Sequence, residues 1–387
     1  MSSVPAGFVP PPYPQDRLGT LRRLADALPG GVVDCSVGDP VDPVPQIVVD
    51  ALREAAPKGA TYPATIGYPY YRDACAGWLE RRFGVTVSPT DVIACIGTKE
   101  LVASLPHMLH LRRPDRDVVL YPAVAYPTYA MGAKLAGLRA VPVPVDKHWH
   151  LDLSRVDPAD AERALLLWIN EPANPTGASV DDEGLAAMVH WARARGIVVA
   201  SDECYAEFTY GDDGAPADPV TVLTGPHVDV LAVHSISKRS NLAGYRAGFV
   251  AGDPDLVQYL GEVRKHAGLM MPAPIQAAAA VAWSDDAHVE VQRERYAERR
   301  ALALPALEKF GLVHDGGPST FYLWLRDAEG TDDSWELAAR LAEAGTLVAP
   351  GDLYGPAGAD HVRLALTQTD DRLELALQRL RETGERR

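Results

Sequence analysis

The sequence predicts an α/β fold: a mostly parallel central sheet covered by helices in a large domain, joined to a smaller α+β domain. Three observations support this prediction. From about residue 46 to 280, short apolar runs rich in β-branched residues alternate with helical stretches. These runs are apolar at every position, which is typical of strands that are buried on both faces of a parallel sheet. From about residue 285 the pattern changes to long helices and separate strands.

Apolar runs mark the strands of the large domain in chain order. We expect these strands at 92–96, 118–121, 164–169, 197–200 and 230–233, with a further strand opening at 244–248. The helix before the 197–200 strand has clear ends. Acidic residues from Asp181 onward crowd its start, where they suit the helix dipole, and Gly196 ends it. We therefore expect residues 164–200 to form one βαβ unit.

The two ends of the chain differ from this alternating pattern. We expect a charged helix at 287–310, a strand at 321–325, a helix at 335–344, a short strand and a last helix at 370–381. Residues 1–45 are expected to be irregular, with a Pro-rich extended arm at 9–14. We therefore expect a large cofactor-binding domain at 46–280. The arm (1–45) and residues 281–387 are expected to form the smaller part.

Charge and composition exclude several classes of protein. The net charge is −15, which argues against a nucleic-acid surface and requires local cations for any anionic substrate. The four cysteines contain no C-x-x-C pair, so neither a zinc site nor a disulfide framework is expected. No signal peptide or transmembrane run is apparent, and we expect a cytoplasmic protein. A Walker motif and a Gly-rich dinucleotide loop are also absent from the sequence.

Polar clusters follow the predicted strands. They occupy 170–177, 201–205, 234–238 and 244–248. Because ligands of open α/β sheets bind beyond the carboxyl ends of the strands, we expect these clusters to meet at one edge. They supply a lysine, a carboxylate, hydroxyl groups and an arginine. Pyridoxal 5′-phosphate needs this set: a lysine for the Schiff base, a carboxylate for the pyridine nitrogen, and Arg and hydroxyl donors for the phosphate.

The motifs resemble those of class I/II aminotransferases of fold type I, whose cofactor is pyridoxal 5′-phosphate. That family carries N-P-x-G, D-x-x-Y and S-x-S-K-x-x-x-x-x-G-x-R-x-G in this order. Here they begin at Asn174, Asp202 and Ser235, and the resemblance covers nearly the whole chain. It implies that Lys238 forms the Schiff base and carries the proton, while Asp202 pairs with the pyridine nitrogen. The other implied cofactor contacts are Tyr205 and Asn174 at the ring 3′-oxygen, Ser235, Ser237, Arg246, Gly97, Thr98 and Lys99 at the phosphate, and Tyr126 stacked on the ring.

The resemblance also implies how substrate and subunits are arranged. Arg363 matches the arginine that binds the α-carboxylate, Gly38 matches a substrate-side glycine, and Asn174 lies beside the substrate. Tyr62 matches a tyrosine that reaches the phosphate site of the neighbouring subunit, so a homodimer with composite sites is expected. Lys99 departs from the smaller or hydroxyl residue that is commoner at its position. His148, Trp149 and His150 form a polar aromatic turn to which no role is assigned.

Five stretches carry a finer resemblance, to actinobacterial N-succinyldiaminopimelate aminotransferases. They are 34–43, 96–100, 233–250, 264–276 and 349–366. This implies transfer of an amino group from glutamate to N-succinyl-2-amino-6-oxopimelate, in lysine and diaminopimelate biosynthesis. Lys99, Arg264 and Lys265 are then candidates for the distal carboxylates. Another amino-acid substrate, or an elimination or cyclisation with the same cofactor, stays open. A regulator on this fold would need a DNA-binding domain, for which residues 1–45 are too short and too Pro-rich.

Overall fold

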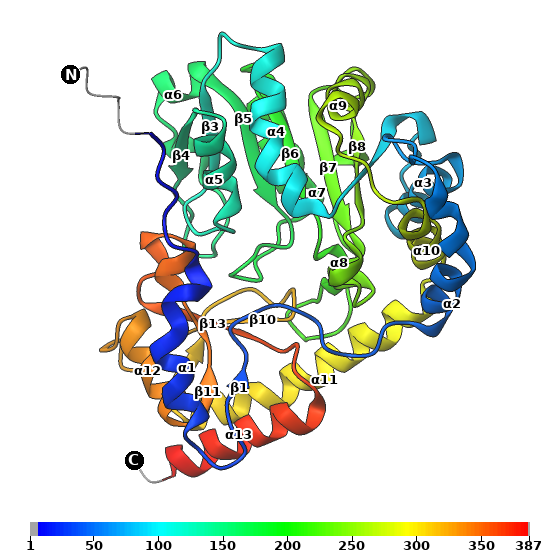
Figure 1. Ribbon diagram of the computed structural model, residues 1–387. Helices are drawn as coiled ribbons and strands as arrows, with labels where there is room; N and C mark the ends of the chain where they lie inside the picture. The colour runs from blue at the N-terminus through cyan, green and yellow to red at the C-terminus, as the bar shows by residue number, and fades with distance from the viewer. Residues whose placement is uncertain (1–6, 386–387) are drawn as a thin grey trace, which may run out of the picture.

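A seven-stranded sheet forms the centre of the structure, a computed structural model that describes residues 7–385 (Figure 1). The strand order is β2-β8-β7-β6-β5-β3-β4, and β8 runs antiparallel to both of its neighbours. The remaining pairs are parallel, so the prediction of a mostly parallel sheet is confirmed. The strands are β2 (Val92–Cys95), β3 (Val118–Pro122), β4 (Arg139–Val143), β5 (Ala164–Asn170), β6 (Val198–Asp202), β7 (Val230–Ser235) and β8 (Gly248–Gly252).

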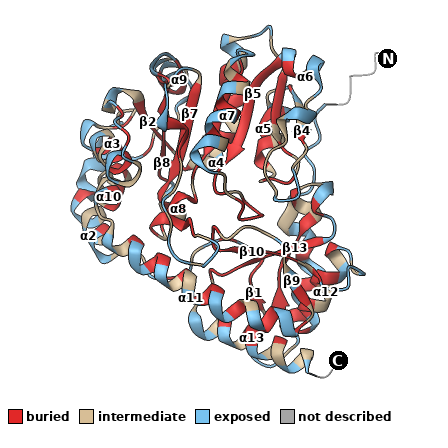
Figure 2. Cartoon of the chain, turned by 180° about the vertical axis from the view of Figure 1, so that it is seen from behind, coloured by how far each residue is buried: buried red, intermediate tan, exposed pale blue. Residues whose placement is uncertain are grey.

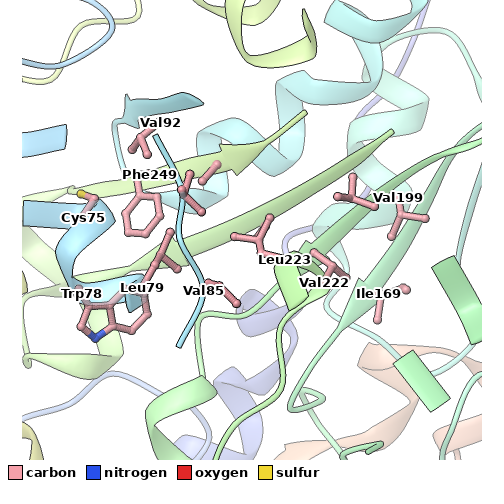
Figure 3. Packing of buried hydrophobic residues seen from close by; sticks show 14 of the residues in the cluster. Cys75, Trp78, Leu79, Val85, Val92, Ile169, Val199, Val222, Leu223 and Phe249 are labelled. Carbon is pink, nitrogen blue, oxygen red and sulfur yellow. The ribbon is translucent and has the colours of Figure 1, made fainter. Parts of the chain in front are cut away.

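Helices cover both faces of this sheet. One face packs against α4 (Thr98–Arg112), α5 (Thr128–Leu135) and α9 (Pro254–Ala267), and the other against α3 (Pro69–Phe83), α7 (Asp182–Arg193) and α10 (Ala273–Ser284). Two further helices are α2 (Gln46–Ala55), which packs on α10, and the short α6 (Pro158–Arg163). Neighbouring strand residues point to opposite cores: Leu166 faces the first and Leu167 the second. On the second face, Trp78 and Leu79 of α3 pack with Phe249 of β8 (Figure 3).

A second, smaller sheet lies beyond the carboxyl ends of the large one. Its order is β12-β13-β10-β9, and all its pairs are antiparallel. Its strands are β9 (Leu312–His314), β10 (Tyr322–Asp327), β12 (Ala349–Pro350) and β13 (His361–Ala365), and its helices are α11 (Ala287–Lys309), α12 (Ser334–Glu343) and α13 (Asp370–Gly384). The strands β10, β12 and β13 are buried at almost every position, whereas β9 is partly exposed, as are the outer faces of α11 and α13 (Figure 2).

The prediction that residues 1–45 are irregular is wrong for part of that segment. α1 (Gly19–Asp26) is a helix, and β1 (Val33–Asp34) pairs in parallel with β11 (Thr346–Leu347). Leu21 and Ala25 of α1 are buried in the core of the smaller sheet, so a helix forms where its apolar stripe finds a partner. The neighbouring prolines hide this short amphipathic signal. Residues 7–13 have no regular structure, as expected for the arm.

A buried ion pair anchors the segment that leads from α1 to the large sheet. Arg299 of α11 binds Asp42 at 2.8 Å, and both side chains are less than 10% exposed. The division into domains at 46 and 280 stays a prediction, although separate sheets lie on either side of it in the chain. Among residues 7–385, no helix is both long and apolar enough to cross a membrane.

Candidate active site

A cavity of about 270 Å³ lies between the carboxyl ends of the large sheet and the smaller sheet. Residues from β5, β6, β7, the start of α4, β10 and β13 line it, together with part of the N-terminal arm. The cavity therefore forms where the ends of the parallel strands meet, as predicted from the polar clusters. Twelve predicted site residues line it: Gly38, Thr98, Lys99, Tyr126, Asn174, Asp202, Tyr205, Ser235, Ser237, Lys238, Arg246 and Arg363.

Asp202 is the only carboxylate among the described residues that line this cavity. It is the last residue of β6 and is 6% exposed. Tyr129 donates a hydrogen bond to its Oδ2 at 2.8 Å, and the backbone N–H of Cys204 donates to Oδ1 at 3.3 Å. Burial raises the pKa of Asp202, because the charged form loses solvation. A cationic partner in the cavity would reverse that shift and keep the carboxylate charged.

Lys238 enters the cavity from the short helix α8 (Ile236–Arg239), directly after β7. Its Nζ donates a hydrogen bond to the backbone carbonyl of Gly38. Gly38 needs to be glycine, because an added Cβ would lie 1.9 Å from the hydroxyl oxygen of Tyr322. Ser235 caps α8 by accepting from the N–H of Ser237 at 3.1 Å, and the two hydroxyls are 2.9 Å apart. The β7–α8 turn thus presents an amine and two hydroxyls to the same space.

The start of α4 forms an anion-binding corner beside these hydroxyls. Gly97 is its N-cap with φ +69°, and Thr98 begins the helix, whose first N–H groups suit an anion. Arg246 lies against Gly97, where an added Cβ would come within 2.2 Å of a guanidinium nitrogen. Arg246 donates to the Ala243 carbonyl at 2.8 Å and has no carboxylate partner among the described residues. Gly97 does not line the cavity itself but determines how closely Arg246 approaches it.

Arg363 lies on the opposite wall, on β13, and is 4% exposed. It donates to Asn174 Oδ1 and to the Ser36 carbonyl, both at 2.8 Å. Its guanidinium carbon is 4.0 Å from the ring centre of Tyr322 and 4.9 Å from that of Tyr354. Asn174 also donates to the hydroxyl of Tyr205, at 3.4 Å. These contacts join the arginine to the predicted ring-binding residues.

Lys99 stands at the mouth of the cavity with neutral partners. Its Nζ donates to the hydroxyl of Tyr13 at 2.9 Å and lies 4.8 Å from the centre of that ring. Burial alone would lower the pKa of Lys99, but the hydrogen bonds with Tyr13 and Tyr126 outweigh it, and the pKa is raised. Lys99 therefore stays charged.

The charge of the cavity is opposite to that of the whole chain. Within residues 7–385, four cationic side chains line it, and none of them has a carboxylate within 4 Å: Lys99, Lys238, Arg246 and Arg363. Unpaired cations facing one cavity are a site for anions. Pyridoxal 5′-phosphate fits this donor set. Asp202 would hold its pyridine nitrogen, the α4 corner with Ser235, Ser237 and Arg246 its phosphate, and Lys238 its aldehyde carbon.

Three other predicted residues lie elsewhere. Tyr62 is 91% exposed and does not line the cavity of this chain. Arg264 is buried and binds Glu100, with Nη1 donating to Oε2 at 3.2 Å. Lys265 pairs with Glu262 at the surface. Neither Arg264 nor Lys265 lines this cavity, and each has a carboxylate partner outside it.

Four tyrosines of the cavity wall were not predicted as site residues. They are Tyr13, Tyr129, Tyr322 and Tyr354. Tyr129 is in the same aromatic stretch as Tyr126, and its ring stacks on Trp168 at 5.0 Å. Its place three residues after Tyr126 is the sequence signal that could have identified it. Tyr322 and Tyr354 reach the site only because the smaller sheet packs over it.

The chain matches the family model of class I and II aminotransferases over residues 31–380. The chain belongs to this family. The aminotransferase is 48% identical over 376 residues to a Mycobacterium tuberculosis protein named "probable aminotransferase Rv1178", covering 96% of this chain and 85% of that one. It is 45% identical to the 4-dedimethylamino-4-oxo-anhydrotetracycline transaminase OxyQ of Streptomyces rimosus, covering 96% and 99%. It superposes with TM-score 0.85 on a Thermus thermophilus structure titled probable N-succinyldiaminopimelate aminotransferase, at 31% identity, covering 96% and 100%.

The aminotransferase is a pyridoxal-phosphate enzyme, as its family is. The cofactor, when bound, supplies a carbonyl carbon that takes up the amino group and a ring that withdraws electrons. The chain supplies the surroundings that this chemistry needs. The buried Asp202 can keep a proton on the pyridine nitrogen, and the amine of Lys238 can accept and return a proton inside the cavity. The fold-type-I prediction and the transaminase prediction are both confirmed.

Proposed function

We propose that this aminotransferase moves an amino group from glutamate to N-succinyl-2-amino-6-oxopimelate. The observation that carries the proposal is the fourth unpaired cation, Lys99, at the mouth of the cavity. Lys238, Arg246 and Arg363 suffice for cofactor and α-carboxylate. Lys99 remains for a further anion, and the succinylated acceptor has carboxylates far from its reacting carbon. The similarity to the Thermus thermophilus protein described as a probable N-succinyldiaminopimelate aminotransferase supports the same substrate.

The roles assigned to individual residues form part of this proposal. Lys238 links to the cofactor and moves the proton between the two carbon atoms that exchange the amino group. Asp202 holds the pyridine nitrogen, with Tyr129 keeping its carboxylate in place. Tyr205 and Asn174 contact the ring oxygen, and Tyr126 stacks on the ring. Arg363, already fixed by Asn174 and the Ser36 carbonyl, binds the α-carboxylate through its fork of donors.

The site is proposed to be completed by a second copy of the chain. Tyr62 is among the most exposed large side chains of the structure, at 91%, although it is an aromatic residue. In the arrangement implied by the family, Tyr62 of one subunit reaches the cofactor phosphate of the other. A homodimer with a two-fold axis would bury both copies of Tyr62 in equivalent places.

A second acceptor class is favoured by one comparison. OxyQ, whose name specifies an oxo-anhydrotetracycline, is 45% identical over 99% of its length. Six tyrosines line the cavity within the described chain, and their rings would suit a planar polycyclic ketone. Such a ketone has no carboxylate for Lys99 to bind. The response of the Lys99 variant therefore separates the two acceptors.

An acceptor screen with glutamate as donor tests the proposal. We expect a clear preference for the succinylated acceptor over 2-oxopimelate, which keeps the reacting end but lacks the succinylamino group. Lys99→Gln should reduce kcat/KM for the succinylated acceptor roughly ten- to 150-fold. The lost charged contact is worth about 1.5–3 kcal/mol, which corresponds to this factor.

Lys265→Gln is the matched control, since Lys265 is an exposed lysine paired with Glu262 outside the cavity. It should leave kcat/KM unchanged. If the enzyme ignores the succinylated acceptor while it aminates other oxo acids or a polycyclic ketone, the proposed substrate is wrong and the aminotransferase assignment stands. If no acceptor, 2-oxoglutarate included, regenerates the cofactor after glutamate has been added, glutamate is the wrong donor.

A further inference from the structure

The loop between β4 and the next helical turn holds the backbone of Trp149 in an unfavourable conformation. Val145 and Leu151 bridge across the base of this loop. Asp146 closes it, with Oδ1 accepting from the backbone N–H groups of His148 at 2.8 Å and His150 at 2.9 Å. The backbone of Trp149 then has φ +68°. A bulky residue rarely adopts a positive φ, so the surrounding contacts must hold it there.

These contacts come from the smaller sheet. The indole Nε1 of Trp149 donates to the backbone carbonyl of Asp315 at 2.7 Å. Its ring meets Trp324 edge-on at 5.8 Å and His361 edge-on at 5.0 Å, measured between ring centres. Trp324 and His361 are themselves stacked at 5.0 Å, with their planes 4° apart. One side chain from the large-sheet part of the chain is therefore seated on a buried aromatic pair of the smaller sheet.

The same face of the smaller sheet carries Arg363. Trp324 on β10 lies directly opposite Arg363 on β13, and directly opposed residues project to the same face. His361 is two residues before Arg363 on the same strand, so its side chain also projects to that face. Tyr354 completes the contact, because its ring meets Trp324 at 6.1 Å and lies under the Arg363 guanidinium at 4.9 Å. A continuous row of packed side chains thus runs from Trp149 to Arg363.

We propose that Trp149 is a positioning residue for Arg363. It fixes the face of the smaller sheet that carries Arg363 against the large sheet that carries Lys238 and Asp202. The inference rests on the proposed role of Arg363 as the α-carboxylate site. The distance between a carboxylate site on one sheet and a reacting amine on the other depends on how the sheets are held together. Trp149 holds them together next to the arginine, and misplacement by about 1 Å is enough to slow a reaction strongly.

The test compares ligands with and without an α-carboxylate. The variants are Trp149→Ala, Trp149→Phe and the control Trp191→Ala, which removes a half-buried tryptophan of α7 that does not line the cavity. The first readout is the dissociation constant of α-methylglutamate, which carries the carboxylate but has no Cα proton to lose. The second is the rate at which glutamate, or its decarboxylated analogue 4-aminobutyrate, converts the bound cofactor.

We expect Trp149→Ala to weaken α-methylglutamate binding and to slow the glutamate reaction about ten- to hundredfold. The rate measured with 4-aminobutyrate should be unchanged, because this amine has no α-carboxylate for Arg363 to bind. Trp149→Phe should recover most of the loss, and Trp191→Ala should behave as the wild type. If Trp149→Ala does not fold, Trp149→Leu removes the N–H donor and the flat ring, and should show the same selective loss.

Equal losses of rate with glutamate and with 4-aminobutyrate would show a purely structural role and overturn the inference. An unchanged dissociation constant for α-methylglutamate in Trp149→Ala would also overturn it. Arg363→Gln separates this result from the proposed function. If Arg363→Gln binds α-methylglutamate as the wild type does, the role of Arg363 fails. If Arg363→Gln loses binding while the Trp149 variants keep it, only the positioning role of Trp149 fails.

Discussion

Gly97→Ala should weaken cofactor binding because the added methyl group displaces the side chain of Arg246. Gly97 has φ +69° and ψ 154°, a conformation that is nearly restricted to glycine, so an alanine there costs about 1–3 kcal/mol of folding free energy. The added methyl would also lie 2.2 Å from a guanidinium nitrogen of Arg246. Since non-bonded contacts need roughly 3.5 Å, the guanidinium must move by more than about 1 Å away from the α4 corner.

The size of the effect on binding follows from what Arg246 does. If the guanidinium no longer reaches the cofactor phosphate, one charge-assisted hydrogen bond worth about 1.5–3 kcal/mol is lost. The dissociation constant of pyridoxal 5′-phosphate should then rise roughly ten- to 150-fold. The assay titrates the apoenzyme with the cofactor and follows its absorbance, and urea unfolding of the apoenzyme measures the strain separately.

Gly137→Ala is the matched control for this prediction. Gly137 has φ +72°, and an added Cβ would meet nothing within 4 Å. It should lose stability through backbone strain, yet bind the cofactor normally. If Gly97→Ala also binds the cofactor as the wild type does, the contact between Gly97 and Arg246 does not determine phosphate binding, and the reasoning is refuted.

Two further predictions concern stability and assembly. Burial raises the pKa of Glu171 from 4.5 to about 8, so the folded state retains a proton that the unfolded state releases. The protonated Glu171 side chain therefore contributes fully to the stability of the folded state below pH 4.5, and this contribution is lost as the pH rises towards 8. The amide that replaces this carboxyl group in the Glu171→Gln variant stays neutral at every pH and can still accept a hydrogen bond from the Val180 N–H. The free energy of unfolding of this variant, measured with urea, should therefore exceed that of the wild type by roughly 1–4 kcal/mol between about pH 5 and 8. Parallel pH profiles of the two proteins would contradict this prediction. For the proposed dimer, mixing Tyr62→Phe chains with Lys238→Ala chains should produce hybrids that contain one native site and are therefore active, and full activity from a monomer would exclude composite sites.

The positions of Asn174, Asp202 and Ser235 could be predicted from the sequence because two local signals coincide. Each residue lies in a polar cluster after a continuous apolar run, and parallel strands bring their carboxyl ends to one edge. Strand direction and burial are short-range properties of the chain. The helix α1 could not be predicted in the same way, because its short apolar stripe becomes meaningful only when the core of the smaller sheet is present to cover it.

Side-chain partners were decided by the tertiary structure alone. Lys99 and Arg264 are both cations in stretches that resemble the same enzyme. Arg264 nevertheless binds Glu100, 164 positions away, while the hydrogen-bond partners of Lys99 within residues 7–385 are tyrosines. Trp149 shows the same limit: the turn at 148–150 follows from local composition, but its contact with Trp324 does not. The chemistry of the cavity could be inferred from residue types near strand ends. Which charges remain unpaired within it depends on packing between distant segments, and local sequence patterns carry no information about those distances.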